Sequence, residues 1–370
     1  MHSPVSTGAH AYANATRPPT LQTLQVLRAL SAVVVVVYHL VHAESVHGGG
    51  VTLLGGPAHF GFAGVDMFFV ISGFIMATVT AGQFGDPAGA LRFLARRAVR
   101  ILPLYWLCTL AIATLLTLRP DALASSLADK SLLQSLLLLP QEGGPLLVVG
   151  WTLTFELFFY AMTALALAAG SARRVPLLIG GWAAVLLILQ AVTIDSPLGR
   201  LFSSPLSLEF MAGVLAGLYW RRLPATLALP AIAWGVTWMI MSGVLLFGIA
   251  GHGQSDGIRT MAFGLPAALI VLGAARIEVA QRLCMPRLLV LLGDASYSLY
   301  LTHVFVLSLA GRLGSGLGLT GSVAGNSVFL LATLLACCLV ALVVYRYVER
   351  PLLNLGNRML AATLMRHRPA

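Results

Sequence analysis

An arginine and a histidine interrupt the first strongly apolar stretch of the chain, LRALSAVVVVVYHL, at Arg28 and His39. Their separation of eleven positions is almost three turns of an α-helix, which turns by about 100° and rises by about 1.5 Å per residue. Both side chains therefore lie on one helix face, roughly 16 Å apart along the axis. Alone, Arg28 could extend to the lipid headgroups and His39 could be a hydrogen-bonded core residue. Their shared face favours a function, namely anion binding beside proton transfer.

Two acidic residues, Asp66 and Glu156, also lie within apolar stretches, GFAGVDMFFVISGF and WTLTFELFFY. A charge at the bilayer centre costs about 2.5–3.5 kcal/mol, so such residues face the protein interior and either pair or serve a function. Asp66 could cap its helix or orient a histidine. Glu156 shares a face with Thr152 and Tyr160 and could pair with an arginine, contact a substrate or orient His39.

Four arginines precede the third apolar stretch, in the segment RFLARRAVRILPLYW. Their number and position are typical of a cytoplasmic anchor. Arg97 and Arg100, three positions apart, also share a helix face and could bind phosphate groups. Charge alone favours the anchor.

A further polar stripe is predicted in SYSLYLTH, where Ser296, Tyr300 and His303 follow i, i+4, i+7 spacing. Hydrogen bonds between helices would account for this stripe without any chemistry. In the closing motif YRYVERP, Arg346 and Glu349 are expected to form a structural salt bridge.

The composition places all these residues in a membrane protein. Of the 370 residues, 58% are hydrophobic and only 10% are charged, with a mean hydropathy of +0.88. The net charge of +10 is better explained by loop charges that set orientation than by nucleic-acid binding. The four cysteines show neither metal-binding nor redox spacing, and no metal site is expected.

Ten apolar segments predict an all-α integral membrane bundle of ten transmembrane helices. They lie at about 24–42, 60–81, 100–118, 149–169, 176–194, 203–220, 225–248, 258–275, 293–311 and 325–347. The run 131–139 is too short to cross the bilayer and is expected on its surface or as a re-entrant segment. With both termini in the cytoplasm, 18 of the 23 Lys and Arg residues fall on the inner side, Arg259 being one of the outer five.

Three parts of the chain are expected. Residues 1–22 are predicted to be a disordered cytoplasmic tail, 23–352 the membrane domain and 353–370 a basic cytoplasmic tail. No loop is long enough to hold a soluble domain.

The order of the motifs resembles acyltransferase family 3, whose members are integral membrane enzymes that acylate sugars and related molecules. The resemblance covers about 24–351 and rests on seven motifs: the Arg28 and His39 pair, FFVISGF, RRAVRILPLYW, WTLTFELFFY, LEFMAG, SYSLYLTH and VERP. It implies a multi-pass protein of the bacterial cytoplasmic (inner) membrane that takes an acyl group, with acetyl favoured, from cytoplasmic acyl-coenzyme A. The implied acceptor is a hydroxyl of a carbohydrate such as an exopolysaccharide, an O-antigen or a lipid-linked sugar.

By this resemblance Arg28 and His39 are the essential pair, and Arg97 and Arg100 form a second basic motif. On chemical grounds the three arginines would bind the donor phosphates, and His39 would be the general base. Glu156 or Asp66 would hold the imidazole in one tautomer. The candidates for the acceptor site or the oxyanion hole are Trp151, Ser296, Tyr300 and His303.

Several alternatives remain open at this stage. A covalent acyl-histidine could replace direct transfer, and the donor could be succinyl or a longer acyl group. A transporter or flippase of a polysaccharide pathway would use the same polar residues without acyl transfer. A structural or regulatory partner of such a pathway is a third possibility.

Overall fold

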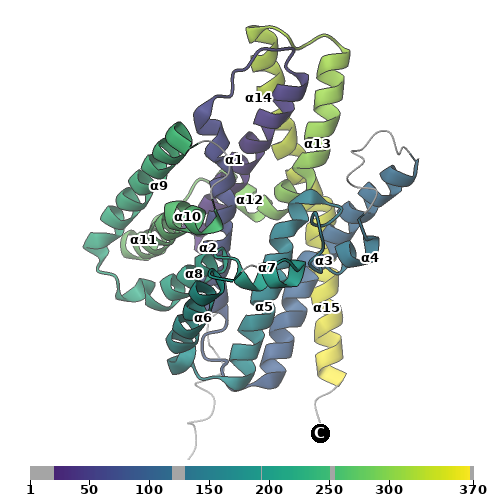
Figure 1. Cartoon of the computed structure of the whole chain (residues 1–370). Coiled ribbons are helices and arrows are strands. Elements are labelled where there is room, and N and C mark those ends of the chain that lie inside the picture. The colour runs from purple at the N-terminus through teal and green to yellow at the C-terminus, as the bar shows by residue number, and fades with distance from the viewer. Residues whose placement is uncertain (1–20, 119–129, 193, 251–254, 367–370) are drawn as a thin grey trace, which may run out of the picture.

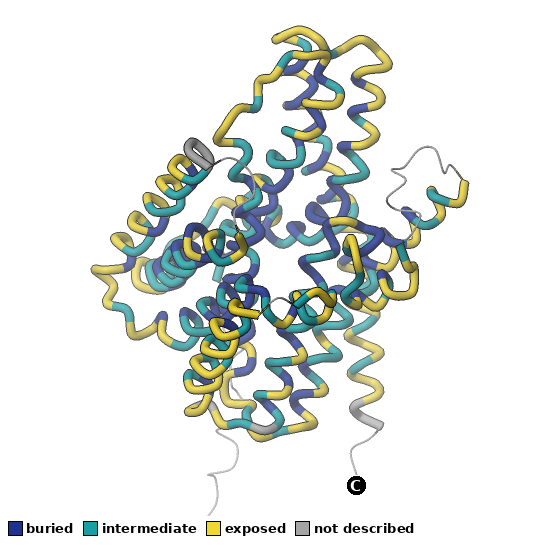
Figure 2. Tube along the Cα trace, viewed as in Figure 1, coloured by how far each residue is buried: buried dark blue, intermediate teal, exposed yellow. Residues whose placement is uncertain are grey.

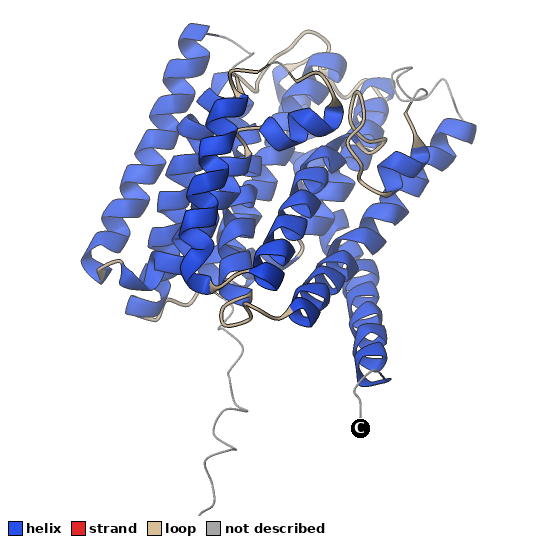
Figure 3. Cartoon of the chain, turned by 60° about the horizontal axis from the view of Figure 1, so that its bottom comes forward, coloured by secondary structure: helices blue, strands red, loops and turns tan. Residues whose placement is uncertain are grey.

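The structure is a computed structural model that describes residues 21–118, 130–192, 194–250 and 255–366. The described residues form α-helices joined by loops and short 3₁₀ and π turns, and no strand occurs among them (Figure 3). The all-α prediction is therefore confirmed for this part of the chain. The predicted N-terminal tail lies outside the described residues as far as residue 20.

Fifteen α-helices follow one another along the described chain (Figure 1). They are α1 (Gln22–His47), α2 (Ala63–Val79), α3 (Pro87–Leu118), α4 (Leu132–Leu136), α5 (Trp151–Ala169), α6 (Val175–Leu189), α7 (Pro197–Ser203), α8 (Ser207–Tyr219), α9 (Ala228–Ala250), α10 (Asp256–Arg259), α11 (Leu265–Gln281), α12 (Arg287–Asp294), α13 (Ser296–Gly316), α14 (Val323–Val344) and α15 (Arg350–Arg366). The 3₁₀ turns are η1 (Gly56–Phe62), η4 (Val148–Gly150), η5 (Ala172–Arg174), η6 (Trp220–Arg222) and η7 (Ala225–Leu227), and the π turns are η8 (Thr260–Gly264) and η9 (Tyr345–Glu349).

Every expected apolar segment falls on helix, but the number that can span a membrane differs from the prediction. Within the described residues, eight helices are long and apolar enough to cross. The expected segment 176–194 forms only the 15-residue helix α6. The expected segment 293–311 belongs to α12 and α13, which are bent by 72° and would make a ninth span if counted as one.

The helix that carries Arg28 and His39 lies inside the bundle and is anchored at both ends. The Glu278 carboxylate accepts hydrogen bonds from the backbone N–H groups of Gln22 and Thr23, both at 2.8 Å, at the start of α1. Near its other end, Glu44 accepts from the N–H groups of Leu53 and Leu54, both at 2.9 Å. Carboxylates at a helix start satisfy N–H groups that have no partner within the helix, so Glu278 sets where α1 begins.

Small residues bring α2 and α8 into close contact. A methyl group at Gly73 of α2 would collide with the carbonyl oxygen of Phe210, and one at Gly213 of α8 with that of Val70. Such contacts are typical of helix packing in membranes, where close backbone approach replaces the hydrophobic driving force. Beside them, the Phe210 and Phe159 rings stack, which joins α8 to α5.

Exposed apolar side chains cover the outward faces of the bundle, whereas buried residues gather along its interior (Figure 2). Helix α9 is the extreme case, because only 11% of the most apolar part of this span is buried inside the protein. Trp234 and Ile240 on this helix are 65% and 58% exposed. A surface of this kind suits hydrocarbon and not water.

Two findings concern the C-terminal segment. The expected tail from residue 353 lies in α15 as far as Arg366, and the π turn η9 joins α15 to α14. The expected salt bridge between Arg346 and Glu349 is wrong. Arg346 is exposed, whereas Glu349 is buried and its Oε2 accepts a hydrogen bond of 2.6 Å from Ser298.

The run 131–139 holds the five-residue helix α4, too short to cross a membrane. The Tyr105 hydroxyl and the Trp106 indole, both near the middle of α3, donate to the carbonyl oxygens of Ser135 at 2.7 Å and Leu136 at 2.8 Å. The segment therefore packs against the middle of a spanning helix.

Candidate functional site

A cavity of about 640 Å³ lies between α1, α2, α3, α5 and α13. It extends to the end of the bundle at which α1 begins, since its lining includes the first turn of α1, the last turns of α2 and the turn η6 that follows α8. The residues concerned are Leu21, Leu24, Gln25, Ala77, Thr78, Val79, Trp220 and Arg221. This is the end that the arginine distribution predicts to be cytoplasmic.

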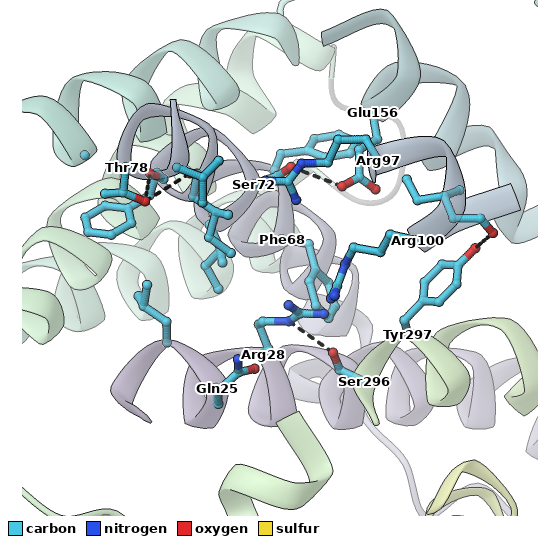
Figure 4. A pocket seen from close by; sticks show the side chains of 18 of the residues that line it. Gln25, Arg28, Phe68, Ser72, Thr78, Arg97, Arg100, Glu156, Ser296 and Tyr297 are labelled. Carbon is cyan, nitrogen blue, oxygen red and sulfur yellow. Dashed lines mark hydrogen bonds between the residues drawn. The ribbon is translucent and has the colours of Figure 1, made fainter. Parts of the chain in front are cut away.

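All three predicted donor-binding residues, Arg28, Arg97 and Arg100, line this cavity. Figure 4 shows the side chains of Arg28 and Arg100 extending toward each other beside Phe68. The Arg28 Nε donates to the Ser296 hydroxyl at 3.2 Å, and the Arg97 guanidinium lies 5.4 Å from the centre of the Tyr160 ring.

The ion pairs within the described residues involve other arginines: Arg92, Arg200 and Arg259. Arg28 lies near the like charge of Arg100 and near the carboxylates of Glu156 and Glu349, and it forms an ion pair with neither carboxylate. Guanidinium groups that share a cavity without close carboxylate partners are suited to bind a multivalent anion.

Glu156 also lines the large cavity, and the expected stripe of Thr152, Glu156 and Tyr160 is confirmed, since all three face it. The Ser72 hydroxyl donates to Glu156 Oε1 at 3.1 Å, and the Tyr160 hydroxyl donates to the same oxygen. Glu156 is thus hydrogen-bonded by neutral groups of α2 and its own helix and forms no ion pair within the described residues.

His39 lies in a second, smaller chamber of about 240 Å³. Its lining comes from the second half of α1, the starts of α2 and α5, the end of α10 and one residue of α13, at the other side of the bundle interior. The lining residues are Val35, Tyr38, His39, Phe62, Val65, Val148, Val149, Trp151, Arg259 and Tyr300. Val65 and Tyr300 line both spaces, so they form the wall between them.

Tyr300 is held in this wall by its hydroxyl group. The hydroxyl donates to the Val149 carbonyl oxygen at 2.9 Å and lies 2.9 Å from the Thr152 hydroxyl. Of the other acceptor or oxyanion candidates, Trp151 lines the small chamber and Ser296 the large cavity.

Asp66 does not contact His39. Its carboxylate is fully buried and binds Arg259 through both oxygens, with Nε at 2.9 and 3.2 Å and Nη2 at 2.9 Å. Arg259, which the expected topology counts among the outer charges, thus pairs inside the bundle, where its side chain is 18% exposed. Its guanidinium also lies 4.9 Å from the centre of the Phe62 ring. The sequence gave no signal for this pairing.

The groups that do contact the His39 ring are the Val35 carbonyl oxygen, at 2.9 Å from Nδ1, and His303, whose Nε2 lies 3.4 Å from the same atom. His303 is fully buried, and the two ring centres are 4.9 Å apart. Sequence spacing placed His303 on a polar stripe with Ser296 and Tyr300, but it could not show which helix the imidazole meets.

No cluster of three or more His, Cys, Asp or Glu side chains suited to a metal ion occurs in the described part of the chain. The polar side chains that line the two spaces are arginines, hydroxyl groups, carboxylates, the Gln25 amide, indole groups and the His39 imidazole. Such groups bind anions, accept protons and donate hydrogen bonds.

Comparison with known proteins gives consistent matches over nearly the whole chain. A family model described as an acyltransferase domain matches residues 21–346. The exopolysaccharide production protein ExoZ of Rhizobium meliloti (strain 1021) is 35% identical over 314 residues, which is 81% of this chain and 92% of that protein. No solved structure matches this fold.

Proposed function

Because this chain belongs to acyltransferase family 3 and is an acyltransferase, we propose that it transfers an acetyl group from cytoplasmic acetyl-coenzyme A to a carbohydrate hydroxyl. The similar Rhizobium protein is named for exopolysaccharide production, which supports a surface polysaccharide or its lipid-linked precursor as the acceptor. The protein would act in the bacterial cytoplasmic membrane, with the donor arriving from the cytoplasm.

The observation that carries this proposal is the order of the two spaces along α1. Arg28 lines the arginine-rich cavity and His39 the small chamber, with Tyr300 in the wall between them. Coenzyme A has its phosphates at one end and its thioester at the other, so it fits this order when the phosphates bind Arg28, Arg97 and Arg100. A volume of about 640 Å³ is within the range of small-molecule sites, which is about 300–1,000 Å³.

The chemistry proceeds in the small chamber. The acceptor hydroxyl gives its proton to His39 while its oxygen attacks the thioester carbonyl carbon. When the tetrahedral intermediate collapses, the C–S bond breaks and the proton on His39 passes to the sulfur. The products are the O-acetyl ester and free coenzyme A, and His39 is neutral again.

Two donors could stabilise the oxyanion of this intermediate. Arg259 and the Trp151 indole both line the chamber with His39. Arg259 binds Asp66 through Nε and Nη2, which leaves Nη1 for a further hydrogen bond. Preorganised donors of this kind are typically the largest single contribution to acyl transfer.

Purified protein in lipid nanodiscs, supplied with radiolabelled acetyl-coenzyme A and a polysaccharide extract, tests the proposal. We expect labelled acetyl groups in the glycan and an equal amount of free coenzyme A. With His39→Gln both products should form about 10²–10⁴-fold more slowly. Mass spectrometry of surface glycans from a deletion strain should show the loss of acetyl esters. Glycans identical to those of the parent strain, with no labelled product in vitro, would contradict the proposal.

The bent pair α12 and α13 also resembles the discontinuous helices of transporters. A transporter or flippase needs two compartments, whereas acyl transfer does not. Transfer of label in detergent solution therefore separates the two functions.

A further inference from the structure

The contact between His303 and His39 joins a fully buried histidine of α13 to the half-buried histidine of α1. His303 comes from α13 and is fully buried, and its Nε2 lies 3.4 Å from His39 Nδ1. The ring planes are inclined by 57°, so the imidazoles are not stacked and the contact is between ring nitrogens.

Hydrogen-bond partners assign the proton of each ring, because a neutral imidazole has one N–H group and one lone pair. The Leu299 carbonyl oxygen, 3.1 Å from His303 Nδ1, can only accept, so Nδ1 carries the proton and Nε2 has the lone pair. The Val35 carbonyl oxygen, 2.9 Å from His39 Nδ1, places the proton of His39 on Nδ1 in the same way. That N–H group is shared between Val35 and the lone pair of His303 Nε2.

We propose that His303 is a positioning residue that holds His39 as the Nδ1–H tautomer, with Nε2 free to accept a proton in the small chamber. This inference rests on the proposed role of His39 in acyl transfer. When His39 becomes positively charged, its Nδ1–H keeps two acceptors, which stabilises the cation where it forms. His303 itself has no N–H left for an oxyanion, so it orients the base and does not touch the reacting atoms.

A neutral partner suits the membrane interior. A carboxylate in this place would need its own counter-charge, as Asp66 has in Arg259. Other titratable or charged groups that face His39 are Tyr38 and His42 on α1, Arg259 from α10 and Tyr300 from α13. Of the side chains in the described residues, His303 is the one that contacts a ring nitrogen of His39.

The test combines spectroscopy with kinetics on the full-length protein in nanodiscs. Selective ¹⁵N labelling of the nine histidines reports the tautomer of each ring, and His39→Gln identifies the His39 signals by their loss. We expect wild-type His39 to be protonated at Nδ1. In His303→Leu the Val35 carbonyl oxygen is the remaining acceptor at Nδ1, so the share of the Nε2–H tautomer should rise. Transfer by His303→Leu should fall by about 10–100-fold, as for partners that orient a ligand or base, with unchanged donor affinity.

Two further variants separate positioning from packing. His303→Gln keeps an acceptor oxygen and should retain more activity than His303→Leu. Thr302→Val is the matched control, since Thr302 is the buried neighbour on α13 whose hydroxyl donates to Ser298 within the helix, at 2.7 Å. It should transfer at the wild-type rate.

Wild-type His39 protonated at Nε2 would overturn the proposal, even if His303→Leu fails to fold. So would wild-type transfer by His303→Leu, or a His303→Gln enzyme no better than His303→Leu. If wild-type protein transfers no acyl group at all, the proposed function fails. The tautomer spectra of the wild type and His303→Leu still decide the positioning role in that case.

Discussion

Arg28 and His39 lie on one face of α1 but line two different spaces, and Tyr300 of α13 belongs to the wall of both. The helix thus passes from an arginine-rich cavity into a small chamber with a histidine. This relationship connects the two halves of the proposed reaction, because the donor binds in one space and reacts in the other. It also predicts that substitutions of Arg28 and of His39 impair different steps, namely donor binding and acyl transfer.

The first prediction separates binding from chemistry. Arg28→Ala should weaken acetyl-coenzyme A binding by about 10–100-fold, as expected for a charge-assisted hydrogen bond of about 1.5–3 kcal/mol. His39→Gln should bind the donor normally but transfer about 10²–10⁴-fold more slowly, because it lacks a proton acceptor. Donor affinity measured beside single-turnover transfer distinguishes the two. A His39→Gln enzyme of near-normal rate would remove the general base from the mechanism.

The second prediction concerns the arginines of α3. Arg97→Ala with Arg100→Ala should raise the KM for acetyl-coenzyme A, since both line the large cavity. Lysine at both positions should rescue only in part, because it lacks the planar fork of arginine. Arg96→Ala is the matched control, since Arg96 is exposed on the same helix. If all these variants had the wild-type KM, Arg97 and Arg100 would anchor the protein in the membrane and would not bind the donor.

The third prediction concerns Tyr300. Tyr300→Ala should remove the wall between the two spaces and admit water to the thioester, so that hydrolysis rises about tenfold relative to transfer. Tyr300→Phe keeps the ring and loses the hydrogen bonds to Val149 and Thr152, so it should keep hydrolysis low. The amount of free coenzyme A relative to acetylated glycan measures hydrolysis relative to transfer. Equal ratios in both variants would show that the ring is no barrier.

The fourth prediction tests the orientation with the natural cysteines. Of the four, Cys284 is the exposed one and follows α11, which the arginine distribution places at the cytoplasmic end. In intact cells, a membrane-permeant maleimide should label Cys284 and an impermeant one should not. Cys284→Ser should abolish the signal. Labelling of Cys284 from outside would invert the topology and place the large cavity on the wrong side for a cytoplasmic donor.

The fifth prediction concerns stability. Asp66→Ala would leave the Arg259 guanidinium buried without its partner, which should destabilise the fold by about 3–5 kcal/mol. Arg92→Ala is the contrast, because Arg92 and Asp86 form an exposed pair that solvent screens. Thermal unfolding in detergent should show a large drop for Asp66→Ala and no measurable change for Arg92→Ala. Similar unfolding midpoints for the two variants would mean that water screens the pair of Asp66 and Arg259 as well.

Much of the architecture could be predicted because apolar runs and helix periodicity act locally. The hydrocarbon core requires each spanning segment to satisfy its own backbone hydrogen bonds, so a long apolar run predicts a helix without knowledge of its neighbours. Periodicity likewise placed Thr152, Glu156 and Tyr160 on one face, and all three line the cavity. The length of an apolar run did not determine where its helix ends or bends, as α6 and the α12–α13 pair show.

The partners of the polar residues were decided by tertiary structure alone. Asp66 pairs with Arg259, 193 positions away, and His39 meets His303, 264 positions away. Helical spacing says which face a residue occupies but not which helix packs against that face. The sequence by itself therefore determined that a cation and a base share one helix face inside a membrane protein. Packing decided that they open into separate spaces and that a second histidine contacts the base, because those contacts depend on how distant helices meet.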